Sequence, residues 1–404
     1  MAGPQPRAFV DLCYFGKLLR AEFPAAEVAR AVREAERHGN KICGLYYLES
    51  YCRQLQTGRV DGSAEPVVSR PRPGAVVVDA KFGFAQPAFA RGLPEAVAAA
   101  RENGVASLAV GHAHTCTSLG YFTEQIARQG LIGLGLTNAS PIVAPPGGKS
   151  RVIGTNPIAF SVPDGNGGIA MQFDQSTTTV ALGKITMAKA AGEPIPEGWA
   201  LDAQGRPTTD PAAALGGTLV SAGGYKGWGF GLMAEVLAAG MTGSVVSRDV
   251  QPLKAPTGPP HDLGQYYLLI DPGGATAFLD RLQSVVDAVA LDEGGRLPGQ
   301  GKRELNPVQI EPAVWDQVSW LAGRAPVSTG SRGMEAGTGR FRSDASPDWA
   351  SAVAAAATRQ PMSVKRAYER VLCIRFPRPR RTGAEGSTGP ANAPRRFWAR
   401  HGPA

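Results

Sequence analysis

Residues 131–138 read LIGLGLTN, and this stretch decides which kind of α/β fold the chain can have. Its apolar residues predict a strand, and it holds a Gly-x-Gly. A Rossmann unit would add a third glycine at the start of a helix and an acidic residue about 20 positions later. Neither follows here, because the chain continues as ASPIVAPPGG. The stretch therefore predicts a strand of an α/β protein that has no Rossmann unit.

The segments around this strand predict a mixed α/β domain. AVVVDA (75–80) and VASLAVGHAH (105–114) have the β-branched or apolar character of strands. We expect VDGSAEPVVSRPRPG (60–74) to be a turn-rich linker, because Gly, Pro, Ser and Asp dominate it. Helical spacing of apolar residues is present in three further segments, 22–39, 44–58 and 94–104.

Length and composition indicate a globular protein with a substantial core. The chain has 404 residues, of which 43% are hydrophobic and 19% charged. No apolar run reaches the roughly 20 residues that span a bilayer, and the first residues lack the order of a signal peptide, so we expect a cytoplasmic protein. The five cysteines are scattered without the spacing of a zinc site, so we expect reduced thiols and no metal.

Positive charge is concentrated at the C-terminal end. Residues 324–404 contain 15 of the 42 Lys and Arg residues but only 5 of the 34 Asp and Glu residues. This segment is rich in Gly, Pro, Arg and Ala, which predicts a mostly disordered basic tail. The remaining body is nearly neutral, so nucleic-acid binding is not expected beyond weak, nonspecific contacts of the tail.

Four motifs carry a resemblance to a known family. GTNPIAF (154–160), GKI (183–185), IPEGWALDAQGRPTTDP (195–211) and GGYKG (223–227) occur in the order and spacing of the NAD(P)-dependent malate/L-lactate dehydrogenase family. This family also includes sulfolactate, ureidoglycolate and diketogulonate oxidoreductases and reductases of Δ1-piperideine-2-carboxylate. The resemblance covers residues 7–323.

The resemblance implies a particular fold and assembly. The expected fold is α/β, with a mixed, largely antiparallel sheet, a non-Rossmann cofactor domain and a helical domain, and the family is usually homodimeric. We expect a cofactor-binding α/β domain at 71–271, with an N-terminal helical segment at 7–70 packed against a C-terminal helical segment at 272–323. The tail at 324–404 lies outside the resemblance.

The resemblance also implies contacts to NAD or NADP, which the sequence does not distinguish. The residues alone also predict an anion site in the loop GHAHTCTSLG (111–120). The backbone N–H groups at the start of the helix that follows suit phosphate or carboxylate oxygens. Carried over residue by residue, the cofactor contacts fall on Thr115, Cys116, Thr117, Ser118, Leu119, Thr155, Asp174, Gln175, Ser176, Leu182, Gly183, Tyr225, Arg296 and Lys302.

One departure from the family concerns the proton donor. Where the family carries Ser-His-Gly, this chain has Ile42-Cys43-Gly44. Isoleucine exchanges no proton, and a thiol is a weak hydrogen-bond donor. Three accounts follow: Cys43 acts as the acid beside a cation such as Lys184; His114 or a bound water supplies the proton; or the substrate needs little acid catalysis.

These observations favour an NAD(P)H-dependent oxidoreductase that interconverts a small 2-oxo acid and a 2-hydroxy acid, of the malate, lactate or sulfolactate type. One alternative is a reductase of cyclic imino acids such as Δ1-piperideine- or Δ1-pyrroline-2-carboxylate, whose protonated imine accepts hydride directly. Another is a cofactor-binding protein with impaired catalysis, because the Ser-His pair is replaced. In each case a small carboxylate substrate and a homodimer are expected, with no membrane partner.

Overall fold

The structure, a computed structural model of the chain, describes residues 22–274, 277–300, 305 and 308–321. The predicted tail at 324–404 and the predicted cofactor residue Lys302 lie outside these ranges. Within them, no helix combines the length and the apolar composition that crossing a membrane requires.

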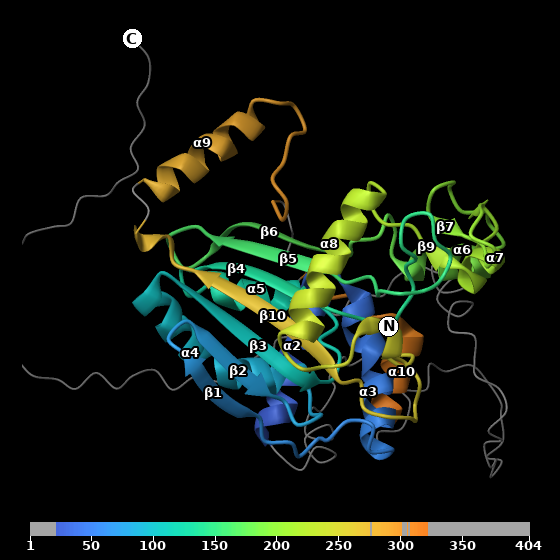
Figure 1. Cartoon of the computed structure of the whole chain (residues 1–404), viewed down its shortest axis with the longest axis horizontal. Coiled ribbons are helices and arrows are strands. Elements are labelled where there is room, and N and C mark those ends of the chain that lie inside the picture. Colours follow the sequence, from blue (N-terminus) through green and yellow to red (C-terminus); the bar gives the residue numbers. More distant parts are fainter. Residues whose placement is uncertain (1–21, 275–276, 301–304, 306–307, 322–404) are drawn as a thin grey trace, which may run out of the picture.

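A seven-stranded sheet forms the centre of the molecule (Figure 1). Its strand order is β1-β2-β3-β10-β4-β5-β6; β2 and β3 pair in parallel, and the other neighbours pair antiparallel. The predicted mixed, largely antiparallel sheet is therefore confirmed. The strands of this sheet are β1 (Val67–Arg72), β2 (Ala75–Asp79), β3 (Val105–Ala113), β4 (Ile132–Thr137), β5 (Ile158–Pro163), β6 (Ile169–Gln175) and β10 (Leu263–Ile270).

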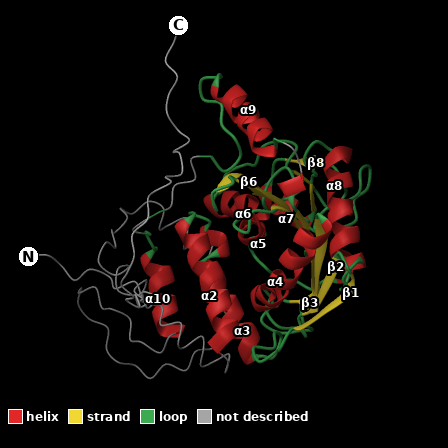
Figure 2. Ribbon diagram, turned by 90° about the vertical axis from the view of Figure 1, so that its left-hand side faces the viewer, coloured by secondary structure: helices red, strands yellow, loops and turns green. Residues whose placement is uncertain are grey.

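Helices lie on both faces of this sheet and along one side of it (Figures 1 and 2). The α-helices are α2 (Glu22–Arg37), α3 (Leu48–Gln56), α4 (Ala85–Asn103), α5 (Gly120–Ala127), α6 (Leu182–Ala191), α7 (Pro211–Gly216), α8 (Tyr225–Glu235), α9 (Phe278–Ala290) and α10 (Pro312–Leu321). The shorter helices are η1 (Lys41–Cys43), η2 (Leu45–Tyr47), η4 (Ser247–Asp249), η5 (Pro272–Gly274) and the π-helical turn η3 (Val236–Gly240).

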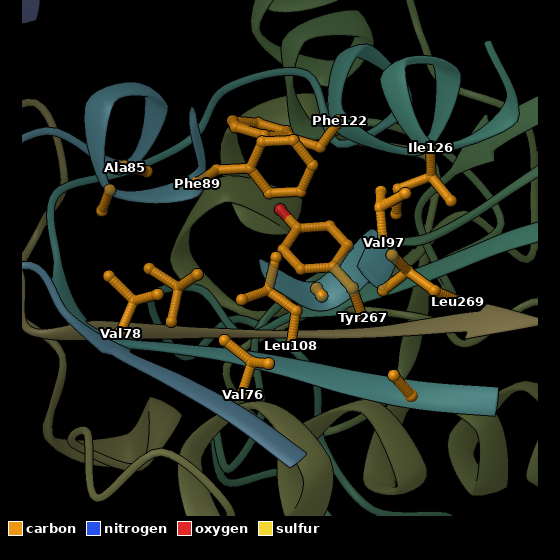
Figure 3. Close-up of a cluster of buried hydrophobic side chains, with 14 of the residues drawn as sticks. Val76, Val78, Ala85, Phe89, Val97, Leu108, Phe122, Ile126, Tyr267 and Leu269 are labelled. Carbon is orange, nitrogen blue, oxygen red and sulfur yellow. The ribbon is translucent and has the colours of Figure 1, made fainter. Parts of the chain in front are cut away.

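The main core lies between the sheet and helices α4 and α5. Figure 3 shows its aromatic centre, where the ring of Phe89 lies 4.9 Å from that of Phe122 and 5.0 Å from that of Tyr267. Such edge-to-face pairs add about 0.5–1.5 kcal/mol each beyond the burial of their surface. Helix α4 approaches the sheet closely because Gly92 has no side chain; a Cβ there would lie 2.5 Å from Val78.

The opposite face of the sheet is covered by α8 and η3. Ala234 of α8 packs there with Ala109, Leu136 and Tyr266 of the sheet in a smaller buried cluster. Two of these four side chains are alanines, which allow the helix and the strands to approach closely. Helix α8 therefore joins the site motifs at its start to the centre of the sheet.

A helical layer forms a separate core beside the sheet. In it, Val28 and Val32 of α2 pack with Tyr51 of α3 and with Val318 and Leu321 of α10 (Figure 2). Helix α9, by contrast, has no buried residue and stands apart from this layer in Figure 1. The division of the chain into the predicted domains stays a prediction.

The residues between the GKI motif (183–185) and the GGYKG motif (223–227) form a small lobe. Its three-stranded sheet has the order β8-β7-β9, formed by β8 (Pro207–Thr208), β7 (Ala200–Leu201) and β9 (Thr218–Leu219). Ile185 of α6 and Ala214 of α7 are buried against this sheet in one apolar cluster. The IPEGWALDAQGRPTTDP segment therefore builds this lobe.

Two sequence predictions need correction. Residues 60–74 are not only a linker, because 67–72 form edge strand β1, whose outer position tolerates Pro71. The predicted boundary at residue 70 therefore falls inside a strand. Helix α4 begins at Ala85, well before the predicted 94, and continues through Pro94.

Candidate functional site

The altered triplet Ile42-Cys43-Gly44 lies in the short connection between α2 and α3. Buried Glu36 of α2 fixes this connection, because its Oε1 accepts the Leu45 N–H at 2.7 Å. The same carboxylate packs directly on Gly44, where a Cβ would overlap it. Burial raises the pKa of Glu36. The backbone of the triplet is thus held by α2, and its side chains are free to meet other elements.

Cys43 lies between a negative and a positive side chain. Burial and the charge of Asp174 raise the pKa of its thiol to about 12, while a hydrogen bond with Asn40 and the charge of Lys254 lower it. The cation that lowers the pKa of this thiol is Lys254. The predicted Lys184 is exposed near the start of α6, and its role stays a prediction. Cys43 keeps its proton throughout the physiological pH range.

His114 is buried, and its surroundings fix its tautomer. The Gln54 amide donates to the carbonyls of Leu253 at 2.8 Å and Ala255 at 2.9 Å, so its oxygen must face His114. That oxygen lies 2.6 Å from His114 Nε2, which must therefore carry the ring proton. Burial, His261 and Arg59 hold the pKa of His114 well below its ordinary value. This neutral ring presents only an acceptor at Nδ1, which disfavours His114 as a proton donor.

The loop after β3 turns several of the predicted side chains into the protein. Cys116 and Leu119 are buried in the main core. Thr115 is also buried, and its N–H donates to His261 Nδ1 at 3.2 Å. Thr117 turns its hydroxyl to the Cys116 carbonyl at 2.7 Å. The alternation of small polar residues in the sequence does not show which of these side chains turn inward, and their contacts with a cofactor stay a prediction.

The expected anion position at the start of α5 is filled by the chain itself. Asp174 Oδ2 accepts the Gly120 N–H at 2.7 Å and the Ser118 hydroxyl at 3.2 Å. A carboxylate at a helix N-terminus satisfies unpaired N–H groups and the positive end of the helix dipole. Asp174 and Ser118 therefore tie β6 to α5. The predicted binding of an anion at this helix start stays a prediction.

A second group of predicted residues comes together around Thr177. Its N–H donates to the Thr155 carbonyl at 2.9 Å, and its own carbonyl accepts the Ala222 N–H at 2.9 Å. The Gly224 N–H then donates to the Ser221 carbonyl at 3.0 Å, which leads into Tyr225. We call Thr155, Ser176–Thr178 and Ser221–Tyr225 the motif cluster, and Lys41–Tyr47, His114–Leu119 and Lys254 the triplet cluster.

The turn at GGYKG leaves its backbone open. Gly224 has φ of +66°, a conformation that favours glycine, and a Cβ there would meet no atom within 4 Å. Tyr225 is 70% exposed at the start of α8. Below the turn, Asn156 donates to Gly231 at 3.0 Å and to Glu235 at 2.7 Å, which anchors the GTNP loop to α8. A ligand can therefore approach this backbone closely.

The remaining predicted residues lie between or beside the two clusters. Gly183 lies next to the triplet, because a Cβ on it would be 3.6 Å from Ile42. Leu182 is partly exposed at the start of α6, and Gln175 ends β6. Arg296 is exposed on the segment whose Pro298 carbonyl accepts the Gln172 N–H at 3.0 Å.

A pocket of about 350 Å³ opens beside Asp174. Its lining includes Ser118, Asn40 and the carboxylates of Glu34 and Glu124. Both glutamates are paired with arginines, Glu34 with Arg33 and Arg37 and Glu124 with Arg128, so the pocket does not carry two free negative charges.

The sequence missed Lys254 as a site residue. Lys254 stands in QPLKAPTGPPHD, a Pro-rich loop far along the chain from the triplet. A lone lysine in such a loop can be predicted to be near the triplet only if the part of the protein that the loop packs against is known. That information comes from Gln54 and Arg59, whose side chains hold the loop against α3.

Comparison with known proteins identifies one family along most of the chain. The malate/L-lactate dehydrogenase family matches residues 16–316. A (2R)-3-sulfolactate dehydrogenase (NADP(+)) of Chromohalobacter salexigens is 42% identical over 301 residues, covering 72% of this chain and 90% of that protein. Delta(1)-pyrroline-2-carboxylate reductase 2 of Burkholderia multivorans is 34% identical over 305 residues, covering 73% and 89%.

Solved structures give the same result for the fold. The delta1-piperideine-2-carboxylate reductase of Pseudomonas syringae has a TM-score of 0.70 at 31% identity, and covers 80% of this chain and 100% of its own. The sulfolactate dehydrogenase of Methanocaldococcus jannaschii has a TM-score of 0.70 at 26% identity, covering 80% and 97%.

Proposed function

Because this chain belongs to the malate/L-lactate dehydrogenase family, we propose that it is an NAD(P)H-dependent oxidoreductase that interconverts a small 2-oxo acid and its 2-hydroxy acid. The observation that carries this proposal is the family match over residues 16–316, which includes both the motif cluster and the altered triplet. The relative at 42% identity, a sulfolactate dehydrogenase, supports a substrate of this class.

The motif cluster fits a nicotinamide dinucleotide. Open backbone at Gly224 allows close approach, and exposed Tyr225 offers a ring and a hydroxyl beside it. In our proposal Thr155, Ser176 and Tyr225 contact the cofactor together with Asp174, Gln175, Leu182, Gly183 and Arg296. When bound, the reduced nicotinamide supplies the hydride. The structure gives no observation that separates NAD from NADP.

Cys43 supplies the proton in this proposal. A 2-oxo acid that accepts hydride at its carbonyl carbon develops an alkoxide, which is a stronger base than a thiolate. A thiol with a pKa of about 12 can therefore donate its proton to that oxygen. The positive charge of Lys254 then stabilises the thiolate that remains.

A second candidate is the reduction of a cyclic imino acid. One observation favours it: neither Cys43 nor neutral His114 is an acid that titrates near neutral pH. A cyclic imine protonated in solution accepts hydride at carbon without further help from an acid. The Burkholderia relative, a pyrroline-2-carboxylate reductase, supports this candidate. A cofactor-binding protein with impaired catalysis is the third candidate, because Ile42 and Cys43 replace the family's Ser-His.

We also propose a homodimer that works in the cytoplasm, where reduced nicotinamide cofactors are recycled. The outer face of α8 and η3 is apolar and exposed, which is unusual for a helix that faces only water. It presents Phe230 at 56% exposure and Val236 at 58% exposure, and continues to Met241 at 56%. Sedimentation of the purified protein tests the assembly.

The function is tested by supplying NADH or NADPH with pyruvate, oxaloacetate, sulfopyruvate or Δ1-piperideine-2-carboxylate and following the absorbance of the reduced cofactor. Oxidation with an oxo acid supports the first proposal, and oxidation with the imine alone supports the second. If the cofactor binds but no substrate is reduced, the third candidate is correct.

A further inference from the structure

Lys254 provides a positive charge next to the connection between α2 and α3, which contains the altered triplet. Its ammonium lies 4.1 Å from the centre of the Tyr46 ring and 5.1 Å from that of Tyr47. Both tyrosines belong to the connection that contains the altered triplet. The electron-rich faces of two rings hold the ammonium in place by cation–π attraction. The side chain is therefore directed over the triplet cluster, although its residue is exposed.

The charge of Lys254 is not neutralised within the structure. Among the described residues, no carboxylate lies within 4 Å of its ammonium. A ring face carries no anionic charge, so the N–H groups of the ammonium that point away from the rings stay available to an anion. Tyr46 and Tyr47 follow Cys43 in the same short connection, so an anion bound here would lie close to the altered triplet.

The backbone of Lys254 is fixed on both sides. Gln54 donates to the carbonyls of Leu253 and Ala255, the two residues that flank it. Arg59, which is buried, donates to the carbonyls of Pro252 and Pro259 at 2.9 Å each. A buried guanidinium and a buried amide thus hold the loop to the end of α3. A cation placed in advance binds an anion with a smaller loss of conformational entropy.

We infer that Lys254 binds the carboxylate of the substrate, with the two tyrosine rings as its support and Cys43 beside the reacting carbon. This inference rests on the proposed function and deepens it. It applies to any small acid whose carboxylate is next to the reacting C=O or C=N bond. Both 2-oxo acids and cyclic imino acids meet this description, so Lys254 serves either candidate reaction.

The test compares Lys254→Met with Lys254→Arg and with Lys189→Met. Lys189 is the control, because it is also an exposed lysine but lies in the last turn of α6, away from the tyrosine rings and outside the proposed site. With the substrate that the wild-type protein reduces, Lys254→Met should raise KM by about 10- to 100-fold, the loss of one charge-assisted hydrogen bond. Lys254→Arg should recover most of the affinity, Lys189→Met should match the wild type, and NADPH affinity should be unchanged throughout.

A KM in Lys254→Met equal to that of the wild type overturns the inference, as does an equal rise in Lys189→Met. Calorimetric titration with oxamate, an unreactive analogue of a 2-oxo acid, measures the same contact without turnover. Binding to the wild type with loss in Lys254→Met supports the inference, and equal binding overturns it. If the wild type binds oxamate, Lys254→Met does not, and no substrate is reduced, the proposed function is contradicted while the Lys254 contact is supported.

Discussion

The motif cluster and the triplet cluster are held together in different ways. In the motif cluster, backbone N–H and carbonyl groups join Thr155, Thr177 and Ala222. In the triplet cluster, the contacts are made by the side chains of Glu36, Gln54 and Lys254. A backbone network depends little on residue identity apart from glycine, whereas a side-chain network changes with each substitution. We therefore expect substitutions in the triplet cluster to change its contacts more than substitutions of non-glycine residues in the motif cluster.

Restoring the family pair Ile42→Ser with Cys43→His should give the largest effect. An imidazole with a pKa near 6.5 would replace a thiol with a pKa of about 12. Because general acid catalysis contributes typically about 10²- to 10⁴-fold, reduction of 2-oxo acids should rise toward the lower part of that range. Reduction of a protonated cyclic imine should change little. Steady-state rates at saturating cofactor measure both, and equal rates for the oxo acid in variant and parent would contradict this prediction.

Gly224→Val should break the motif cluster. Valine at φ of +66° is strained, and its branched side chain would cover the open backbone. The affinity for reduced cofactor, measured by fluorescence titration, should fall by about 10- to 100-fold, or 1–3 kcal/mol. Gly167→Val, which has the same strain at φ of +82° in a distant turn, is the control and should retain affinity. Loss of affinity in both variants would mean that strain alone is responsible.

Acid should destabilise the protein through two buried histidines, His114 of the triplet cluster and His261, whose rings stack on one another. Burial lowers the pKa of His261 to about 3 and holds that of His114 well below its ordinary value. Their folded pKa values are depressed, so the stability they contribute is present above about pH 6.5 and is lost as the pH falls. At pH 5 the loss from His261 should be about 2 kcal/mol, and that from His114 should have the same sign. Urea unfolding at pH 7 and pH 5 measures the total loss.

Two variants test whether the buried histidines cause this pH dependence of stability. His261→Gln should reduce the dependence by roughly half, because one of the two buried histidines is removed. The control is His38→Gln, which replaces an imidazole that is not part of the stacked His114–His261 pair. This variant should lose as much stability between pH 7 and pH 5 as the wild type. An unchanged dependence in His261→Gln would show that the acid sensitivity arises elsewhere.

Thr155→Val should have the smallest effect. It removes one hydroxyl from the motif cluster and keeps both the shape of the residue and the carbonyl that accepts from Thr177. Cofactor affinity should weaken by about 0.5–1.5 kcal/mol, the usual net value of one hydrogen bond. A loss as large as that in Gly224→Val would mean that side chains, and not the backbone, carry cofactor binding in this cluster.

The sequence predicts the features that depend on local pattern. The runs at 75–80 and 105–114 form β2 and β3, and 131–138 forms β4, because an apolar strand is visible in its own residues. Edge strand β1 was missed because its pattern is interrupted by polar residues and Pro71. The first half of α4 was missed because Pro87 and Gly92 conceal helical spacing, although Gly92 is what lets the helix reach the sheet.

The candidate site was predictable only where a motif could be recognised. Thr155 and Tyr225 stand in such motifs, and their loops meet through Thr177. The burial of Cys116 and Leu119 and the capping role of Asp174 could not be seen, because they depend on which strands are neighbours. Lys254 was missed for the same reason, and Lys184 was chosen because it is close to a motif in sequence. The surroundings of these residues depend on contacts between segments that are far apart in the sequence.

The kcat of Cys43→Ala with a 2-oxo acid and with a cyclic imino acid tests whether the Cys43 thiol donates the proton. Thermal melting shows that the variant is folded, and the cofactor is supplied at a saturating concentration. Oxo-acid reduction should fall by about 10²-fold or more, while reduction of the protonated imine should be nearly unchanged. Oxo-acid reduction equal to that of the wild type in a folded, cofactor-bound variant would contradict this role of the thiol.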